Sequence, residues 1–100
     1  MANSAIDYPW DKEWVNGTGT VVAHPCVLHS IVLNGATTLG TVTVYDDIDA
    51  ADAGQIVAVY NFLGVSVSYQ GITFLYDIEM KIGVHMVFTT FAGNFTITYK

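Results

Sequence analysis

Apolar and polar residues alternate with a period of two over most of the chain after residue 18. This period is typical of β-strands that bury one face and leave the other in water. The clearest example is the 72–82 segment, in which every second residue from Ile72 to Ile82 is apolar and the intervening residues are polar, apart from Leu75. The pattern predicts a long strand with one wet face.

Several shorter segments show related patterns between turn residues and are predicted to be strands as well. These segments are 41–45, 56–60, 65–69 and 95–99. The 27–33 and 84–90 segments differ, because each carries apolar residues on both of its faces. Such a strand is expected either in the middle of a stack or against a neighbouring subunit.

Turn residues such as glycine, asparagine and proline separate these segments at short intervals, and no segment shows a convincing helical period. The sequence therefore predicts an all-β fold: a single jelly-roll-like β-sandwich of about seven or eight short antiparallel strands. The strand order stays open, since a jelly roll and an immunoglobulin-like sandwich share this alternation.

The first eighteen residues break the pattern. Ile6, Tyr8, Trp10 and Trp14 lie among charged residues without sustained alternation, and Pro9 opposes a regular helix. We expect an extended N-terminal arm over residues 1–18 and a β-sandwich domain over residues 19–100.

Composition then limits the partners. Only 12% of the residues are charged while 52% are hydrophobic, so the surface is poorly protected against association. Nine acidic and three basic residues give a net charge of −6, which argues against nucleic acid as a partner. The single cysteine, Cys26, cannot form an intramolecular disulfide. The chain carries neither a long apolar run nor a signal-like N-terminus, so we expect no membrane association.

No motif of a nucleophilic hydrolase or a cysteine protease occurs, and we expect neither an enzyme nor a cofactor. His24, Cys26 and His29 carry zinc-binding side chains, but strand geometry would turn His29 away from the other two. We therefore expect no metal at these residues. The acidic segment 46–52 offers oxygen ligands for calcium without the pattern of an EF-hand, and whether it binds calcium stays open.

Exposed aromatic side chains favour a second interpretation, because aromatic rings also stack on sugars in β-sandwich modules that bind carbohydrate. The candidates are Trp10, Trp14, Tyr45 and Tyr60. Aromatic residues at alternate strand positions are, however, most often core or interface residues.

Taken together, the strands of residues 19–100 resemble those of the small all-β virion proteins of tailed bacteriophages. The segments that carry this resemblance are 27–31 (VLHSI), 40–46 (GTVTVYD), 54–58 (GQIVA), 72–82 with Gly83, and 95–100 (FTITYK). The resemblance implies a capsid decoration (cement) protein or a head or tail fibre component, which works without an active site and typically as a homotrimer.

On this interpretation the partner is the major capsid protein or another virion protein, and the chain is made in the host cytoplasm and resides on the capsid surface. The arm residues Ile6, Tyr8, Trp10 and Trp14 are then the expected contacts with the capsid. The expected subunit contacts are Val27, His29, His85, Val87, Phe88 and Phe91. The alternative is a tail- or fibre-associated β-sandwich module that binds host glycans.

Overall fold

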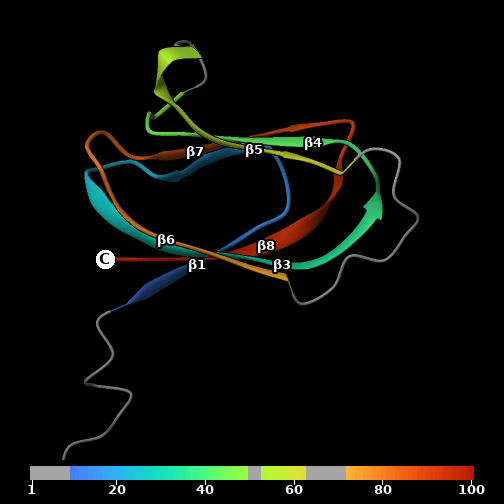
Figure 1. Ribbon diagram of the computed structural model, residues 1–100, viewed down its shortest axis with the longest axis horizontal. Coiled ribbons are helices and arrows are strands. Elements are labelled where there is room, and N and C mark those ends of the chain that lie inside the picture. The colour runs from blue at the N-terminus through green and yellow to red at the C-terminus, as the bar shows by residue number, and fades with distance from the viewer. Residues whose placement is uncertain (1–9, 50–52, 63–71) are drawn as a thin grey trace, which may run out of the picture.

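Among the residues that the computed structural model describes, eight antiparallel strands form two four-stranded sheets that pack face to face (Figure 1). The structure describes residues 10–49, 53–62 and 72–100. The predicted strand at 65–69 lies outside these residues. The all-β sandwich that the hydrophobic pattern predicts is thereby confirmed.

The first sheet, called sheet A, has the strand order β1-β8-β3-β6. Its strands are β1 (Asp11–Val15), β8 (Ala92–Tyr99), β3 (Cys26–Thr38) and β6 (Ile72–Met80). Sheet B has the order β2-β7-β4-β5. Its strands are β2 (Gly19–Val22), β7 (Val84–Thr89), β4 (Thr41–Tyr45) and β5 (Ile56–Asn61), the last preceded by the short 3-10 turn η1 (Ala53–Gln55).

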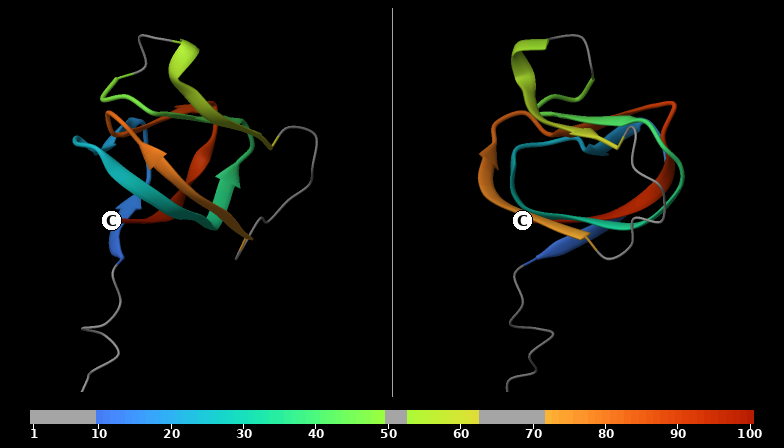
Figure 2. Two further views of the ribbon diagram at one scale, coloured as in Figure 1. Left: turned by 60° about the vertical axis from the view of Figure 1, so that its left-hand side comes forward. Right: turned by 45° about the vertical axis from the view of Figure 1, so that its right-hand side comes forward.

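This strand order is that of a jelly roll. The first strand pairs with the last, β2 with β7, β3 with β6 and β4 with β5, as if one long antiparallel hairpin had been wound around the core. Figure 2 shows the result as two layers joined at both ends by chain that passes from one sheet to the other. The order that alternation alone leaves open is thus the jelly-roll order.

The core fills the space between the sheets with the apolar face of each strand. Its buried members are Val22, Cys26, Leu28, Ile31, Leu33, Val42, Val44, Tyr60, Phe62, Met80, Val84, Met86, Phe91, Phe95 and Ile97. Tyr60 of β5 stacks on Phe74 of β6, and the hydroxyl groups of Tyr60 and Tyr76 are hydrogen-bonded. Burial of Tyr60, followed by its contact with Tyr76, raises the pKa of the Tyr60 hydroxyl. This aromatic contact joins the edges of the two sheets.

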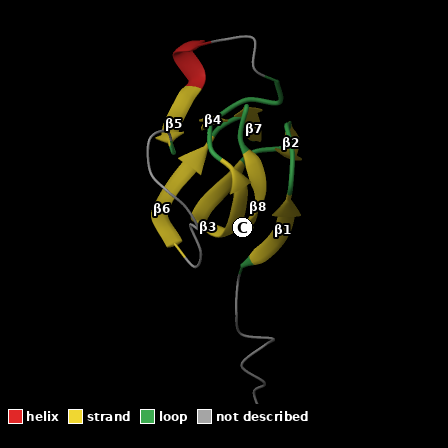
Figure 3. Cartoon of the chain, turned by 90° about the vertical axis from the view of Figure 1, so that its right-hand side faces the viewer, coloured by secondary structure: helices red, strands yellow, loops and turns green. Residues whose placement is uncertain are grey.

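The N-terminal region differs from the expected arm, because residues 11–15 form β1. This strand pairs with β8 along its whole length, from Asp11 opposite Tyr99 to Val15 opposite Phe95 (Figure 3). Its alternation was hidden because an edge strand buries little: Val15 is half-buried while the other four residues of β1 are exposed. The sandwich thus begins at β1 and not at residue 19. The arm residues Ile6 and Tyr8 lie outside the described residues.

A second difference concerns the inward face of β3. Simple alternation places His29 on the same face as Ile31, but Leu28 and Ile31 are both fully buried. The reason is a β-bulge: β3 gains one residue relative to β8 between Leu28 and Ser30. The pairing of β3 with β6 is irregular at the same position, where the two residues Tyr76 and Asp77 of β6 lie opposite the single residue His29.

We predict that Gly40→Ala destabilises the fold. Gly40 lies between β3 and β4, where the chain passes from sheet A to sheet B, and an added Cβ would lie 2.4 Å from the Phe91 nitrogen and from the Thr89 carbonyl oxygen. These are backbone atoms, so the sheets must shift, and we expect the free energy of unfolding to fall by about 1–3 kcal/mol. Urea unfolding measures it, with Gly17→Ala as the control because no atom lies within 4 Å of its added Cβ. Equal stability of the two variants would contradict the expectation.

Candidate functional site

The outer face of sheet A is the part of the molecule where sequence-predicted binding residues gather. Both tryptophans of the chain lie on β1 or next to it. They have different surroundings, because Trp10 is half-buried whereas 61% of Trp14 is exposed. The two side chains therefore define two separate clusters.

The first cluster joins Trp10 to the bulge in β3 and β6. The indole of Trp10 stacks on the imidazole of His29, with ring centroids 4.0 Å apart and an interplanar angle of 8°. Nδ1 of His29 is hydrogen-bonded to the carboxylate of Asp77. A carboxylate only accepts, so Nδ1 carries the proton of this bond. Asp77 has a left-handed backbone with φ of 53°, which aspartate tolerates better than most residues.

The second cluster surrounds Trp14 with uncharged polar groups. The indole N–H of Trp14 donates a hydrogen bond of 3.3 Å to Oδ1 of Asn94 on β8. Thr96 lies directly opposite Trp14 in the register, and its hydroxyl oxygen accepts a 3.0 Å hydrogen bond from Nδ2 of Asn34 on β3. Side chains from three neighbouring strands thus come together beside one exposed ring.

The rows of the sheet extend this cluster across the face. The row of Trp14 continues through Thr96 of β8 and Val32 of β3 to Thr73 of β6, and it contains no ionisable side chain. In the next row, Leu75 of β6 is 69% exposed. That second row runs through Ser30 of β3 and Thr98 of β8 to the exposed Lys12 of β1. This part of the face can form hydrogen bonds and apolar contacts, and its charge lies at Lys12, two residues from Trp14.

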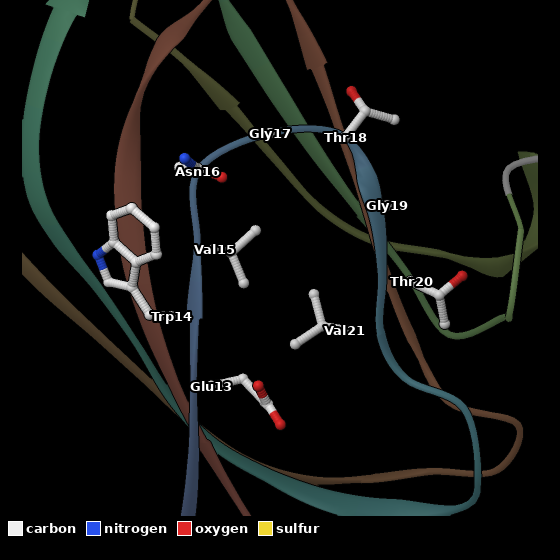
Figure 4. A pocket seen from close by; sticks show the side chains of 9 residues that line it. All are labelled: Glu13, Trp14, Val15, Asn16, Gly17, Thr18, Gly19, Thr20 and Val21. Atoms are coloured by element: carbon white, nitrogen blue, oxygen red, sulfur yellow. The ribbon is translucent and has the colours of Figure 1, made fainter.

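An open hollow of about 220 Å³ lies between the edges of the two sheets. Residues 13–21 line it, from the end of β1 through the turn into β2. Val15 and Val21 point toward each other across the space, whereas Trp14 points away from it (Figure 4). Thr18 fastens the turn to β7, because its hydroxyl oxygen accepts a 2.9 Å hydrogen bond from the Phe88 N–H. The hollow and the Trp14 cluster therefore open on different sides of β1.

The expected subunit contacts do not form one surface. Val27 and His29 belong to sheet A, whereas His85 and Val87 lie on β7 of sheet B. Phe91 is only 6% exposed, and it packs with Phe88 and Phe95 inside the sandwich. Because Phe91 fills the core of its own chain, it is not available to a neighbouring subunit.

His85 is held within sheet B by its own chain. The Thr20 hydroxyl donates a 2.6 Å hydrogen bond to the carbonyl oxygen of Ile48, which uses its one proton. The 3.0 Å bond between Thr20 and Nδ1 of His85 is then donated by the imidazole. This arrangement fixes the ring next to Tyr45, whose centroid lies 6.3 Å away.

The three zinc-type side chains near the start of β3 do not converge. Nδ1 of His24 contacts the carbonyl oxygen of Pro25 at 2.9 Å, Cys26 is buried, and His29 is engaged with Asp77. Burial, and then the charge of Asp46, raises the pKa of the Cys26 thiol, which opposes the thiolate that zinc binds. Among the described residues, no group of three or more His, Cys, Asp or Glu side chains is placed to hold a metal ion.

Asp46, the first residue of the acidic segment, stabilises the turn between β6 and β7. Its carboxylate accepts hydrogen bonds from the backbone N–H groups of Lys81, Ile82 and Gly83, at 3.0, 2.9 and 3.3 Å. Burial alone raises the pKa of this carboxyl, but the three hydrogen bonds and the charge of Lys81 outweigh it, so the pKa lies below its ordinary value of 3.8. The side chain that looked like a calcium ligand thus contributes to the fold.

Sequence patterns alone do not reveal several of these residues. Asn34 and Asn94 read as turn residues beside glycine, although both lie within strands, and Thr96 reads as one polar position among many. Asp77 reads as part of a wet strand face. The signal that the sequence does carry is the pair of tryptophans four residues apart, which a strand places on one face.

Comparisons with known proteins add no relative: no family model, no curated protein and no solved structure matches this chain. In the part of the chain that the structure describes, no helix has the length and apolar character needed to cross a bilayer.

We predict that Asp46 makes folding stability depend on acid. Because the folded-state pKa of Asp46 is lowered, its stabilising effect is fully present above the ordinary pKa and is lost as the pH falls through the lower folded-state value. Asp46→Ala is expected to lower the free energy of unfolding by about 1.5–3 kcal/mol at neutral pH. Asp46→Asn keeps one oxygen acceptor and should lose less. Urea unfolding from pH 7 down to pH 2 tests this, with the exposed Glu79→Gln as control, and a wild-type acid dependence retained in Asp46→Ala would refute it.

We also predict that His29 shields Trp10 from water. In a Trp14→Phe protein, Trp10 is the one remaining tryptophan, and its fluorescence reports the stack directly. His29→Ala should shift the emission to the red, because the indole becomes solvated. Asp77→Asn should leave it unchanged, since asparagine still accepts from Nδ1 and tolerates the positive φ, whereas Asp77→Gly should shift it part of the way. An unchanged emission maximum in His29→Ala would show that the stack does not form in solution.

Proposed function

We propose that this chain is a non-enzymatic virion structural protein of a tailed bacteriophage: a capsid decoration (cement) protein that binds the head as a homotrimer and stabilises it. The observation that supports this proposal is the stack of Trp10 on His29, whose ring is hydrogen-bonded to Asp77, on a jelly-roll sandwich. The stack fixes Trp10, which directly follows residues 1–9, with the apolar Ile6 and Tyr8, in the sequence.

The proposed mechanism is burial of surface. The partner is the major capsid protein or another virion protein, and the chain acts on the capsid surface after synthesis in the host cytoplasm. Apolar side chains that become buried between capsid subunits raise the free energy needed to separate those subunits, by the same linkage that makes any ligand of the assembled state stabilising. The small number of charges, 12% of the residues, keeps the electrostatic cost of such contacts low.

The second candidate function is a tail- or fibre-associated module that binds host glycans. The cluster around Trp14 favours it, because an exposed indole is held beside the side chains of Asn94, Thr96 and Asn34. These groups match the apolar face and the hydroxyl edge of a sugar ring. A decoration protein can carry such a site on a face that the capsid leaves open.

Binding to heads tests the first function. We expect the full chain to co-sediment saturably with empty heads assembled from the capsid protein encoded in the same genome, and to raise the temperature at which those heads come apart. A chain that starts at Trp10 should keep the fold and lose most of this binding. A start at Gly19 would be a poor control, because it removes β1 from sheet A.

The oligomeric state is measured on the same two proteins by light scattering. A trimer formed by both would place the subunit contact in the sandwich and leave residues 1–9 for the capsid. No co-sedimentation of the full chain, or a monomer at every concentration in both proteins, would refute the decoration function as stated.

A further inference from the structure

We propose that the cluster of Trp14, Asn94, Thr96 and Asn34 on the outer face of sheet A is a binding site for uncharged polysaccharide, with one pyranose ring stacked on the Trp14 indole. The inference rests on the second of the two functions above and deepens it by assigning the site and the class of ligand. It does not depend on whether the chain also decorates a head.

The indole is both exposed and oriented. Trp14 lies on the edge strand β1 and is 61% exposed, so a broad aromatic surface stays open to solvent. The hydrogen bond from its indole nitrogen to Oδ1 of Asn94 restricts rotation of the ring about its side-chain torsions. A ring that is already oriented loses less conformational entropy when a ligand stacks on it.

Hydrogen-bonding groups lie beside the ring on the next two strands of the sheet, β8 and β3. Thr96 is directly opposite Trp14, and its hydroxyl oxygen accepts from Nδ2 of Asn34, so that bond does not use the hydroxyl proton of Thr96. The amide oxygen of Asn34 is a further acceptor on an exposed side chain. A sugar ring has an apolar C–H face for the indole and hydroxyl groups at its edge for these donors and acceptors.

The row of the cluster itself favours an uncharged ligand, and the charge in the neighbouring row is that of Lys12. The row from Trp14 through Thr96 and Val32 to Thr73 contains no ionisable side chain. The chain as a whole carries a net charge of −6, so it repels acidic polymers. Added salt weakens this repulsion. A cationic polymer finds no carboxylate in this row to pair with.

The shape of the surface suits a chain of sugars better than one isolated ring. The row crosses four adjacent strands, which at normal strand spacing is about 14 Å from end to end. It lies on the outer surface of a sheet, so a polymer can pass across it in either direction. A small free sugar needs an enclosed pocket for tight binding. A polysaccharide does not, because several of its sugar units can contact the face at once and their contributions to the binding free energy add up.

Affinity electrophoresis of the full chain tests the proposal. Native gels contain one of four uncharged polymers, dextran, β-glucan, mannan or galactan, and polygalacturonate serves as the acidic comparison. We expect retardation in at least one neutral polymer and none in polygalacturonate. Trp14→Ala should lose about tenfold or more in affinity, the effect of removing one stacked aromatic ring. Asn94→Ala should lose less, because the ring remains.

Two controls show whether the Trp14 ring itself makes the contact with the polymer. Val59→Ala removes an exposed apolar side chain of β5 in sheet B, away from this face, and should bind as the wild type does. In a Trp10→Phe protein, Trp14 is the one tryptophan left. Titration with an oligosaccharide prepared from the polymer that retards the protein should then change the fluorescence of Trp14 until the site is saturated. Melting curves of each variant establish that it is folded.

Three results would overturn the inference. These are no retardation in any of the four neutral polymers, equal retardation of wild type and Trp14→Ala, and stronger binding to polygalacturonate than to any neutral polymer. If Trp14→Ala lost binding to heads while no polymer bound the wild type, the face would be a protein contact. The glycan site would then be refuted and the decoration function would stand.

Discussion

Burial of two apolar sheet faces against each other is the interaction on which the rest of this protein depends. The two sheets are separate hydrogen-bonded units, so side chains between them must supply most of their attraction. Leu28 and Phe95 of sheet A and Val44 and Met86 of sheet B belong to the same core cluster, and all four are fully buried. Each such side chain contributes about 1.5–3 kcal/mol. The inner faces are thereby committed to folding, and the outer faces are left for contacts with other molecules.

The outer face of sheet A carries two tryptophans with different roles. At the start of β1, Trp10 is stacked on His29 and is part of the structure of its own chain. Near the end of β1, the indole N–H of Trp14 is hydrogen-bonded to Asn94, and its ring is exposed to solvent. The same residue type thus acts as an internal contact and as an external one, and the difference comes from the bulge that brings Asp77 and His29 within reach of Trp10.

Period-two alternation is sufficient to predict the sandwich, because it shows directly which side chains face the core. The prediction is wrong at the two places where the alternation is absent or shifted. At β1 an edge strand buries too little to show a pattern, and at His29 one extra residue reverses the alternation of β3. The polar partners of Trp14 were out of reach for another reason, since residues 34 and 94 become neighbours through the strand order, which alternation does not specify.

The antiparallel pairing of β1 with β8 brings the two ends of the described chain together. Asp11 lies opposite Tyr99, so Trp10 and Lys100 emerge from the same end of two adjacent strands (Figure 1). A short linker could join these ends, and new termini could be opened in an exposed turn with the sandwich intact. For the same reason, a protein fused after Lys100 would project from one corner of sheet A, leaving the outer face of sheet B clear of the cargo.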